Sequence, residues 1–512
     1  MFSRVLIANR GEIAIRVART CRKLGIVPCG VFSLADVSAL HRRFMDDDVC
    51  LGPAPPIQSY LNPDAILPAA RQLGCEAIHP GYGFLAETAD FAKRCEEEGI
   101  AFVGPPSSAM ALTGDKIASR RKMAEAGLRV TEGMDRPLQS VEEARDVADK
   151  LGYPVMLKAT AGGGGIGMAR VDSSELVARA FESVRSAALA NFGNPDIFLE
   201  RYHRRARHIE IQVVIDAHGH GVHLGERECS VQRRHQKLIE ESPSPVVSRE
   251  VREEIGSLAV RSLESVGYRN AGTVEFLYAD GRFHFNEVNA RLQVEHPVTE
   301  MVTGVDLVEL QLRVAAGESL GIEQRDIRMR GHAMECRVNA EDPAQNFAPS
   351  PGLIQGYREP RGAGVRVDSG VEEGAEVSTM YDPLIAKLIV HTRDRASSIA
   401  KMRAAVDDFV IEGITTTLAF HHAMLRDPSF VKGALWTAMV ADLGIVDRIR
   451  APKPVGDDEI QAVAAVIAKL PGGPERFSEP PLRPASAPTR WARLGREENL
   501  GRRPDEVPPR RR

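Results

Sequence analysis

The chain has 512 residues, room for about three domains of ~150 residues each. Apolar residues make up 43% and charged residues 27%, as in ordinary globular proteins. The 66 Lys and Arg against 70 Asp and Glu leave a formal charge of −4, which argues against nucleic acid or a membrane surface as the main partner. No apolar run approaches the roughly 18 residues of a membrane span, and the N-terminus is not typical of a signal peptide.

Seven cysteines are scattered along the chain, and none of them forms a CxxC pair. An odd number without such pairs argues against a disulfide framework and a structural zinc site. We therefore expect each cysteine to be a free, buried thiol and the protein to be cytoplasmic, in a reducing compartment.

The chain opens with a strand, a helix and a strand, at residues 4–8, 13–25 and 26–32. Such a βαβ unit predicts a parallel sheet. The first turn contains Gly11 alone instead of GxGxxG, which weakens the case for a dinucleotide site there. Further strand-and-loop patterns extend this open α/β domain over residues 1–113.

Two lysines lie beside features suited to an anion. Lys116 falls in the first turn of a helix predicted over residues 114–126, where a cation opposes the helix dipole unless an anion lies between them. The alternative is a lysine that points into water. Lys158 ends a predicted strand just before the glycine-rich loop 162–167, whose N–H groups could cradle a phosphate. The alternative for that loop is a flexible hairpin, and it is not a P-loop, because no GK[ST] follows.

The middle of the chain combines predicted strands with dense charge. Residues 208–216 alternate between apolar and polar side chains, which predicts a strand. Residues 225–245 carry many Arg, His and Lys residues and predict a loop, either solvated or anion-binding. Strands at 273–278 and 282–289 are joined by ADG, a hairpin signal.

Acidic residues of this hairpin suggest a metal site. Glu275 lies on the strand that pairs with the strand of Glu287, and Asn289 is nearby. Two carboxylates and an amide are hard oxygen ligands suited to Mg²⁺. Two glutamates exposed to water are the alternative. The alternation continues through residues 286–295, which predicts a strand whose polar face is either solvated or the floor of a site.

The C-terminal quarter changes character at about residue 447. Residues 331–447 show short strands and helices, as in an α+β domain. Residues 457–470 could form one isolated amphipathic helix. Residues 471–512 are rich in proline and arginine and poor in apolar residues, which predicts disorder.

Together these segments resemble biotin carboxylase, the ATP-grasp component of biotin-dependent carboxylases such as acetyl-CoA carboxylase. The resemblance runs from Arg4 to about Asp447. The motifs that carry it are IANRGEIA, HPGYGFLAE, FVGP, GDK, GGGGIGM, RHIEIQV, ERECSVQRRHQK, GTVEFLY, NEVNARLQVEHPVTE, ECRVNAED and YDPLIAKL.

The resemblance implies an α/β and α+β protein with three domains. These are a Rossmann-like pre-ATP-grasp domain over residues 1–113, an ATP-grasp domain over 114–330 with a mobile lid at about 131–203, and a biotin carboxylase C-terminal domain over 331–447. Residues 448–512 would be a linker, a short helix and a disordered tail.

The resemblance also implies the roles of individual residues. ATP would contact Lys116, Lys158, Gly163, Gly164, Gly165, Gly167, Glu200, His208, Gln232 and His235. Mg²⁺, or Mn²⁺ in its place, would bind Glu275, Glu287 and Asn289. Bicarbonate would contact Arg291, Gln293, Val294, Glu295 and Lys237. The catalytic residues would be Glu295 as the base, Arg291, Lys237 and Arg337, the last stabilising the ureido oxygen of biotin.

The implied reaction is ATP-dependent carboxylation of biotin by bicarbonate through carboxyphosphate. It would be the first half-reaction of an acyl-CoA carboxylase, with acetyl-CoA as the expected acceptor. The partners would be a biotin carboxyl carrier protein and a carboxyltransferase, because no AMKM-like biotin attachment motif and no carboxyltransferase segment appear. The resemblance also suggests a homodimer. The alternatives are another ATP-grasp carboxylate ligase and a slow or non-catalytic assembly protein.

Two positions depart from the family pattern. The glycine-rich loop carries Ile166 where the family has Arg or Lys, which bears on how the lid closes. His203 stands where an apolar residue is expected near adenine, which bears on nucleotide fit.

Overall fold

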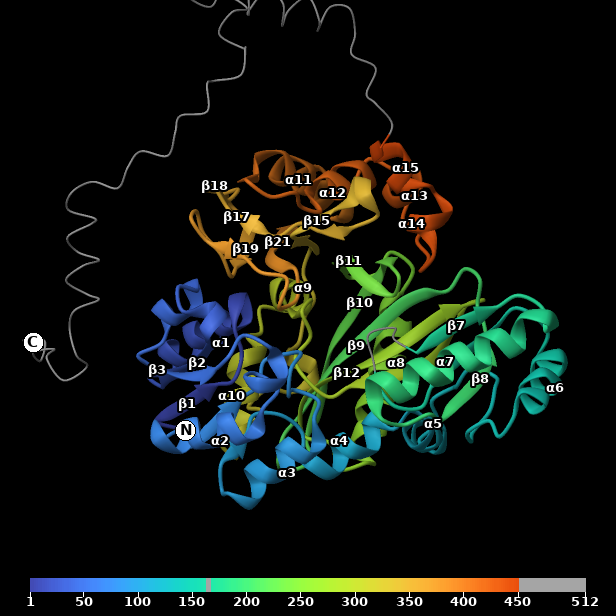
Figure 1. Cartoon of the computed structure of the whole chain (residues 1–512), viewed down its shortest axis with the longest axis horizontal. Coiled ribbons are helices and arrows are strands. Elements are labelled where there is room, and N and C mark those ends of the chain that lie inside the picture. The colour runs from blue at the N-terminus through green and yellow to red at the C-terminus, as the bar shows by residue number, and fades with distance from the viewer. Residues whose placement is uncertain (163–166, 451–512) are drawn as a thin grey trace, which may run out of the picture. The chain divides into compact units, whose positions relative to one another are not determined.

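The computed structural model describes residues 1–162 and 167–450, all of which belong to one compact unit, Met1–Arg450 (Figure 1). The glycine-rich positions 163–166, and the helix and tail predicted beyond residue 450, lie outside the described residues. None of the described helices is long and apolar enough to cross a membrane.

The N-terminal part contains a five-stranded sheet in the order β3-β2-β1-β4-β5, and all neighbouring strands are parallel. This confirms the parallel sheet predicted from the βαβ pattern. The strands are β1 (Arg4–Ile7), β2 (Val27–Ser33), β3 (Asp47–Gly52), β4 (Ala77–His79) and β5 (Ala101–Phe102). The helices are α1 (Gly11–Lys23), α2 (Pro63–Gln72), α3 (Ala89–Glu97) and α4 (Ser107–Gly114).

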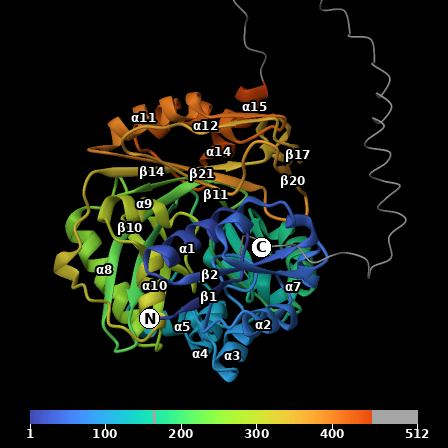
Figure 2. The same cartoon turned by 90° about the vertical axis from the view of Figure 1, so that its left-hand side faces the viewer.

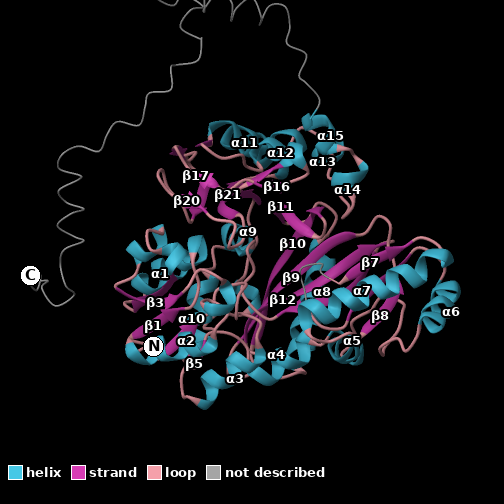
Figure 3. Cartoon of the chain, in the orientation of Figure 1, coloured by secondary structure: helices cyan, strands magenta, loops and turns pink. Residues whose placement is uncertain are grey.

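Alternate residues of β1 enter different cores. Val5 and Ile7 pack with Ile13 of α1, whereas Leu6 packs with Ile66 of α2. The sheet is therefore covered on both faces, as a parallel sheet requires, and the two helices lie on either side of β1 in both views (Figures 2 and 3).

Residues 116–201 contain helices and a small sheet in the order β7-β6-β8. The elements are α5 (Lys116–Glu125), α6 (Val141–Leu151), β6 (Val155–Ala159), β7 (Met168–Val171), α7 (Val177–Phe192) and β8 (Ile197–Arg201). Leu157, Phe181 and Leu199 belong to a hydrophobic core confined to this segment. The lid expected at about 131–203 thus coincides with a segment that has its own core.

An eight-stranded antiparallel sheet joins the middle of the chain to its C-terminal part, in the order β13-β12-β9-β10-β11-β14-β21-β19. Its strands are β9 (Arg207–Ile215), β10 (Gly221–Arg233), β11 (Gln236–Ser242), β12 (Asn270–Ala279), β13 (Arg282–Asn289), β14 (His332–Asn339), β19 (Val365–Ser369) and β21 (Leu384–Thr392). The helices α8 (Arg249–Glu264), α9 (His296–Thr303) and α10 (Leu307–Ala315) pack on it. Because β14 pairs with β11, one sheet continues across the domain boundary expected at residue 330.

The C-terminal part adds short strands and helices around a second large core. The strands are β15 (Glu341–Asp342), β16 (Ala348–Pro349), β17 (Gly352–Leu353), β18 (Gly356–Arg358), β20 (Glu376–Val377) and β22 (Val410–Glu412). The helices are α11 (Arg395–Asp408), α12 (Leu418–Met424), α13 (Pro428–Val431), α14 (Met439–Asp442) and α15 (Ile445–Arg450). Helix α11 packs on β14 and β21 (Figure 2).

The strand predicted for residues 286–295 is wrong beyond Asn289, where β13 ends. A loop follows, and α9 begins at His296. Ala290 and Leu292 are buried in this loop. The alternating pattern therefore comes from a loop in which apolar Ala290 and Leu292 enter the core, while polar Gln293 and Glu295 are also buried.

The loop predicted for residues 225–245 is also wrong as a conformation, while its anion-binding role stays a prediction. Strands β10 and β11 form a hairpin here, with left-handed backbone at the turn residues Arg234 (φ 50°) and His235 (φ 66°). Several of its charged residues pair with charged residues of neighbouring elements, and so they can be accommodated within a sheet. One of the seven cysteines, Cys50, is exposed, contrary to expectation; the other six are buried, and all are free.

Candidate active site

A cavity of about 1170 Å³ lies where the three parts of the unit meet. It brings together most of the side chains expected from the sequence. Lining it are Lys116, Lys158, Glu200, His208, Gln232, His235, Lys237, Glu275, Glu287, Asn289, Arg291, Gln293, Val294, Glu295 and Arg337. Gly167 is not part of the lining; its carbonyl accepts a hydrogen bond from the Ala159 N–H at 2.8 Å. Gly163, Gly164 and Gly165 lie outside the described residues.

Lys237, at the start of β11, is surrounded by three carboxylates. Its Nζ lies 2.6 Å from Glu210, 2.8 Å from Glu275 and 2.6 Å from Glu295. Burial disfavours the charged ammonium, but the three carboxylates outweigh it and raise the pKa of Lys237 well above its usual value. Lys237 is therefore a fixed positive charge on the cavity floor.

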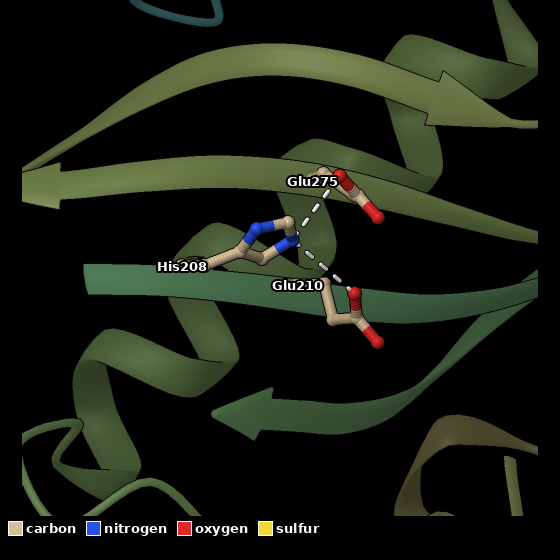
Figure 4. Close-up of side chains that lie close together, drawn as sticks. All are labelled: His208, Glu210 and Glu275. Carbon is tan, nitrogen blue, oxygen red and sulfur yellow. Dashed lines mark ion pairs between the residues drawn. The ribbon is translucent and has the colours of Figure 1, made fainter. Parts of the chain in front are cut away.

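His208 on β9 joins the same cluster (Figure 4). Its Nε2 lies 3.1 Å from Glu275 and 3.5 Å from Glu210. Burial lowers the pKa of His208, but the Glu275 carboxylate more than offsets this, and the pKa rises to about 9. The three groups are close enough to hold a metal ion. The distances of Nε2 to both carboxylates are also those of an ion-pair cluster.

The hairpin of β12 and β13 brings Glu275 and Glu287 directly opposite each other, as register partners. Asn289 follows on β13, and its Oδ1 accepts a hydrogen bond from Arg291 at 3.1 Å. Two carboxylates and an amide oxygen on one hairpin are hard donors with the chemistry that Mg²⁺ prefers. The residues present thus fit a magnesium ion.

One end of the cavity carries the two lysines expected to bind phosphates. Lys116, at the start of α5, donates to the Gly162 carbonyl and lies 3.4 Å from Glu287. Lys158, on β6, lies 2.6 Å from Glu200. Lys116 therefore lies beside Gly162, the last described residue before positions 163–166, and carboxylates hold both ammonium groups in place.

The loop that follows β13 lines the other end of the cavity. Arg291 pairs with Glu87 through its Nε at 2.9 Å. Glu295 is 1% exposed, and besides Lys237 it contacts Arg337 at 2.8 Å. Arg337 also donates from Nε to Glu240 at 2.6 Å. Arg337 is thus held by two carboxylates through Nε and one terminal nitrogen, and its NH1 makes no hydrogen bond to any described residue.

Arg227 on β10 is a site residue that the sequence analysis missed. Its side chain is fully buried and donates to Glu210 at 2.5 Å and to the Gln293 side-chain carbonyl at 3.0 Å. The Gln293 amide nitrogen in turn donates to Glu275 at 2.9 Å. Arg227 therefore sets which way the Gln293 amide points. Its partners lie 17 and 66 residues away in sequence, so only the folded sheet reveals the contact.

His203 lies at the apolar end of the cavity, which Met156 and Leu277 also line. Its ring lies against that of His284 in a tilted arrangement, with ring centroids 4.6 Å apart. Burial lowers the pKa of His203, and its buried Nε2 has no hydrogen-bond partner among the described residues. This end can therefore accept a flat, largely apolar ring and offer it one polar contact.

Models of known protein families match the N-terminal, middle and C-terminal parts of the chain. Residues 1–110 match "Biotin carboxylase, N-terminal domain" and residues 335–442 match "Biotin carboxylase C-terminal domain". Residues 115–323 match "Carbamoyl-phosphate synthase L chain, ATP binding domain".

Two relatives show how far the similarity extends. One of the subunits of pyruvate carboxylase from Methanothermobacter thermautotrophicus is 52% identical over 440 residues, which cover 86% of this chain and 90% of that protein. The biotin carboxylase of Pseudomonas aeruginosa is 49% identical over 437 residues, which cover 85% of this chain and 97% of that protein.

Solved structures agree with these matches. The biotin carboxylase of Campylobacter jejuni, in a β-γ-ATP complex, has a TM-score of 0.84 and 43% identity and covers 86% of this chain and 99% of its own. The biotin carboxylase domain dimer of Hydrogenobacter thermophilus 2-oxoglutarate carboxylase, with MgADP, ADP and bicarbonate, has a TM-score of 0.85 and 44% identity, covering 87% and 98%. These findings confirm the ATP-grasp fold expected from the sequence, and the chain belongs to the biotin carboxylase family of ATP-dependent ligases.

Proposed function

We propose that this chain uses ATP and bicarbonate to carboxylate biotin carried on a separate protein. The observation that carries the proposal is the position of Glu295, buried between Lys237 and Arg337 in the cavity that also holds Lys116 and Lys158. One cavity thus combines a carboxylate base, cations for a small anion and cations for phosphates. The relatives whose structures contain ADP, bicarbonate or β-γ-ATP support the same choice of substrates.

The first step is attack of bicarbonate on the γ-phosphate of ATP. Arg291 grips bicarbonate as a planar fork, and the Gln293 side chain and Val294 backbone add hydrogen bonds. Glu295 accepts the bicarbonate proton. Burial raises the pKa of Glu295, but Lys237 outweighs it and the pKa is lowered, so the carboxylate is ionised and ready at neutral pH.

The nucleotide end supplies positioning and charge. Lys116 and Lys158 neutralise the phosphates, while the segment at about 131–203 acts as a lid that excludes water. Glu200, His208, Gln232 and His235 complete the nucleotide site. Glu275, Glu287 and Asn289 would hold Mg²⁺ or Mn²⁺, which supplies charge neutralisation between phosphate oxygens when bound.

The second step transfers CO₂ to biotin. Carboxyphosphate breaks down to CO₂ and phosphate, and that phosphate removes the proton from the ureido nitrogen of biotin. Negative charge then develops on the ureido oxygen. The free NH1 of Arg337 is the group we assign to stabilise it, because Glu240 and Glu295 already fix the rest of the guanidinium.

The partners follow from this chemistry. The chain would work as a homodimer with a biotin carboxyl carrier protein and a carboxyltransferase, in the cytoplasm. The carboxyltransferase selects the acceptor, for which we propose an acyl-CoA, with acetyl-CoA tested first. Relatives named for pyruvate and propionyl-CoA make those two the comparison substrates.

The test is ADP release by the purified chain with and without free biotin and bicarbonate. The proposal requires release that depends on both. ATP hydrolysis at a rate that does not depend on biotin would favour another ATP-grasp ligase. The absence of any ATP hydrolysis would favour a non-catalytic assembly protein.

A further inference from the structure

A fully buried lysine lies behind the proposed bicarbonate loop and has no place in the chemistry above. Lys387, on β21, is 0% exposed. Its Nζ donates to the Val294 carbonyl at 3.0 Å and pairs with Glu12 at 3.1 Å; Asp368 lies 3.9 Å away. An ammonium without access to water needs such partners, so its position is tightly fixed.

These contacts join segments that are far apart in sequence. Glu12 lies in the first turn of α1 and also accepts a hydrogen bond from the hydroxyl of Tyr82, and both of these residues line the cavity. Lys387 comes from the YDPLIAKL motif, Glu12 from IANRGEIA and Tyr82 from HPGYGFLAE. The proposed chemistry assigns no role to these three motifs. Around Lys387 they meet at the loop that carries Arg291 and Glu295.

Val294 is the point at which the contact reaches the site. It lies between Gln293 and Glu295 in a stretch without helix or strand hydrogen bonding. A fixed carbonyl fixes its peptide plane, and this plane includes the N–H of Glu295. Holding the Val294 carbonyl therefore sets the direction in which the Glu295 side chain leaves the backbone.

We infer that Lys387 is a positioning residue that holds the loop at residues 290–295 in its bicarbonate-binding geometry by anchoring the Val294 carbonyl to α1 and β21. The inference rests on the proposed function and adds a residue that never touches substrate. A misplacement of about 1 Å at a reacting group can cost on the order of 10²-fold in rate. The hydrogen bonds and ion pairs of Lys387 with described residues do not extend to α5 or β6, which build the ATP end.

The experiment compares Lys387→Met with the natural protein in biotin-dependent ADP release. We expect KM for bicarbonate to rise about 10–100-fold, while KM for ATP changes by less than about 3-fold. Lys387→Arg keeps a donor near the carbonyl, so it should recover part of the loss. Glu12→Gln removes a partner of Lys387 but leaves the Val294 bond, and we expect a smaller rise in KM for bicarbonate.

Arg395→Met is the matched control. Arg395 pairs with the buried Glu241 at 2.8 Å, outside the cavity lining, so this variant also removes a partly buried cation that is paired with a buried carboxylate. It should lower the melting temperature without changing KM for bicarbonate. If Lys387→Met does not fold, the Lys387→Arg and Glu12→Gln variants carry the same comparison.

Equal KM for bicarbonate in folded Lys387 variants and in the control would overturn the inference. So would parallel changes in KM for both ATP and bicarbonate, because they would indicate general damage. A natural protein without biotin-dependent turnover would instead contradict the proposed function, and the two failures are thus distinct.

Discussion

Replacing Glu295 by glutamine tests the proposed base with little change in shape. Glu295 is 1% exposed, and its two oxygens lie 2.6 Å from Lys237 and 2.8 Å from Arg337. In the amide, one of these positions becomes an NH₂ group that faces a cationic donor, so one charge-assisted bond is lost. Such a bond contributes about 1.5–3 kcal/mol. Lys237 keeps Glu210 and Glu275, and no cation is left without a carboxylate.

We therefore expect Glu295→Gln to fold, with its free energy of unfolding lowered by about 2–3 kcal/mol. Bicarbonate-dependent ADP release should fall about 10²–10⁴-fold, the usual loss for a missing general base. Glu241→Gln is the control, because Glu241 is equally buried, is paired with Arg395 and lies outside the cavity lining. It should lose similar stability in urea unfolding and keep its activity. Turnover by Glu295→Gln within about 3-fold of the natural protein would remove Glu295 from the base role.

Three further predictions concern the metal, the pH dependence of stability and the lid. Glu287→Gln should raise the Mg²⁺ concentration that gives half-maximal ADP release about tenfold or more, since it removes one hard oxygen ligand; an unchanged midpoint would exclude Glu287 as a ligand. Burial lowers the pKa of His421 from 6.5 to about 4, so its contribution to stability is complete above pH 6.5 and is lost as the pH falls towards 4. Between pH 7.5 and pH 5 this group lowers the free energy of unfolding by about 2 kcal/mol. In urea unfolding, His421→Gln should therefore lose about that much less stability over this pH range than the natural protein, and an equal loss in the variant would contradict the prediction. Ile166→Arg should raise kcat/KM for ATP about 3–30-fold by adding a charge-assisted contact to the glycine-rich loop, and slower turnover would show that the isoleucine itself contributes.

The sequence was sufficient for features that depend on local pattern. The βαβ unit predicted the parallel sheet, and the ADG turn predicted a hairpin whose register places Glu275 opposite Glu287. Each of these two features is formed by segments that lie within about thirty residues of one another. The alternation of apolar residues and the residue types of the turn determine structure over such short separations, so both features can be predicted from the sequence.

The sequence-based predictions were wrong where contacts between residues far apart in the sequence decide the structure. Residues 225–245 look like a charged loop, but Arg227 and Lys237 lie on the two strands of a hairpin and meet a carboxylate of a neighbouring strand. Composition cannot show these partners. Residues 290–295 keep a strand-like period because Ala290 and Leu292 are buried in two different cores, although no strand is present. Pro297, in the first turn of α9, was the signal that a helix was about to begin.

The most direct test of the proposed reaction is to follow an oxygen atom from bicarbonate. The purified chain would be incubated with ATP, Mg²⁺, free biotin and ¹⁸O-labelled bicarbonate, and the phosphate product would be examined by ³¹P NMR. Attack of bicarbonate on the γ-phosphate predicts one ¹⁸O atom in each phosphate, because carboxyphosphate releases CO₂ by breaking its carbon–oxygen bond. Phosphate without label, formed at the same rate, would mean that water attacks ATP and would contradict the account.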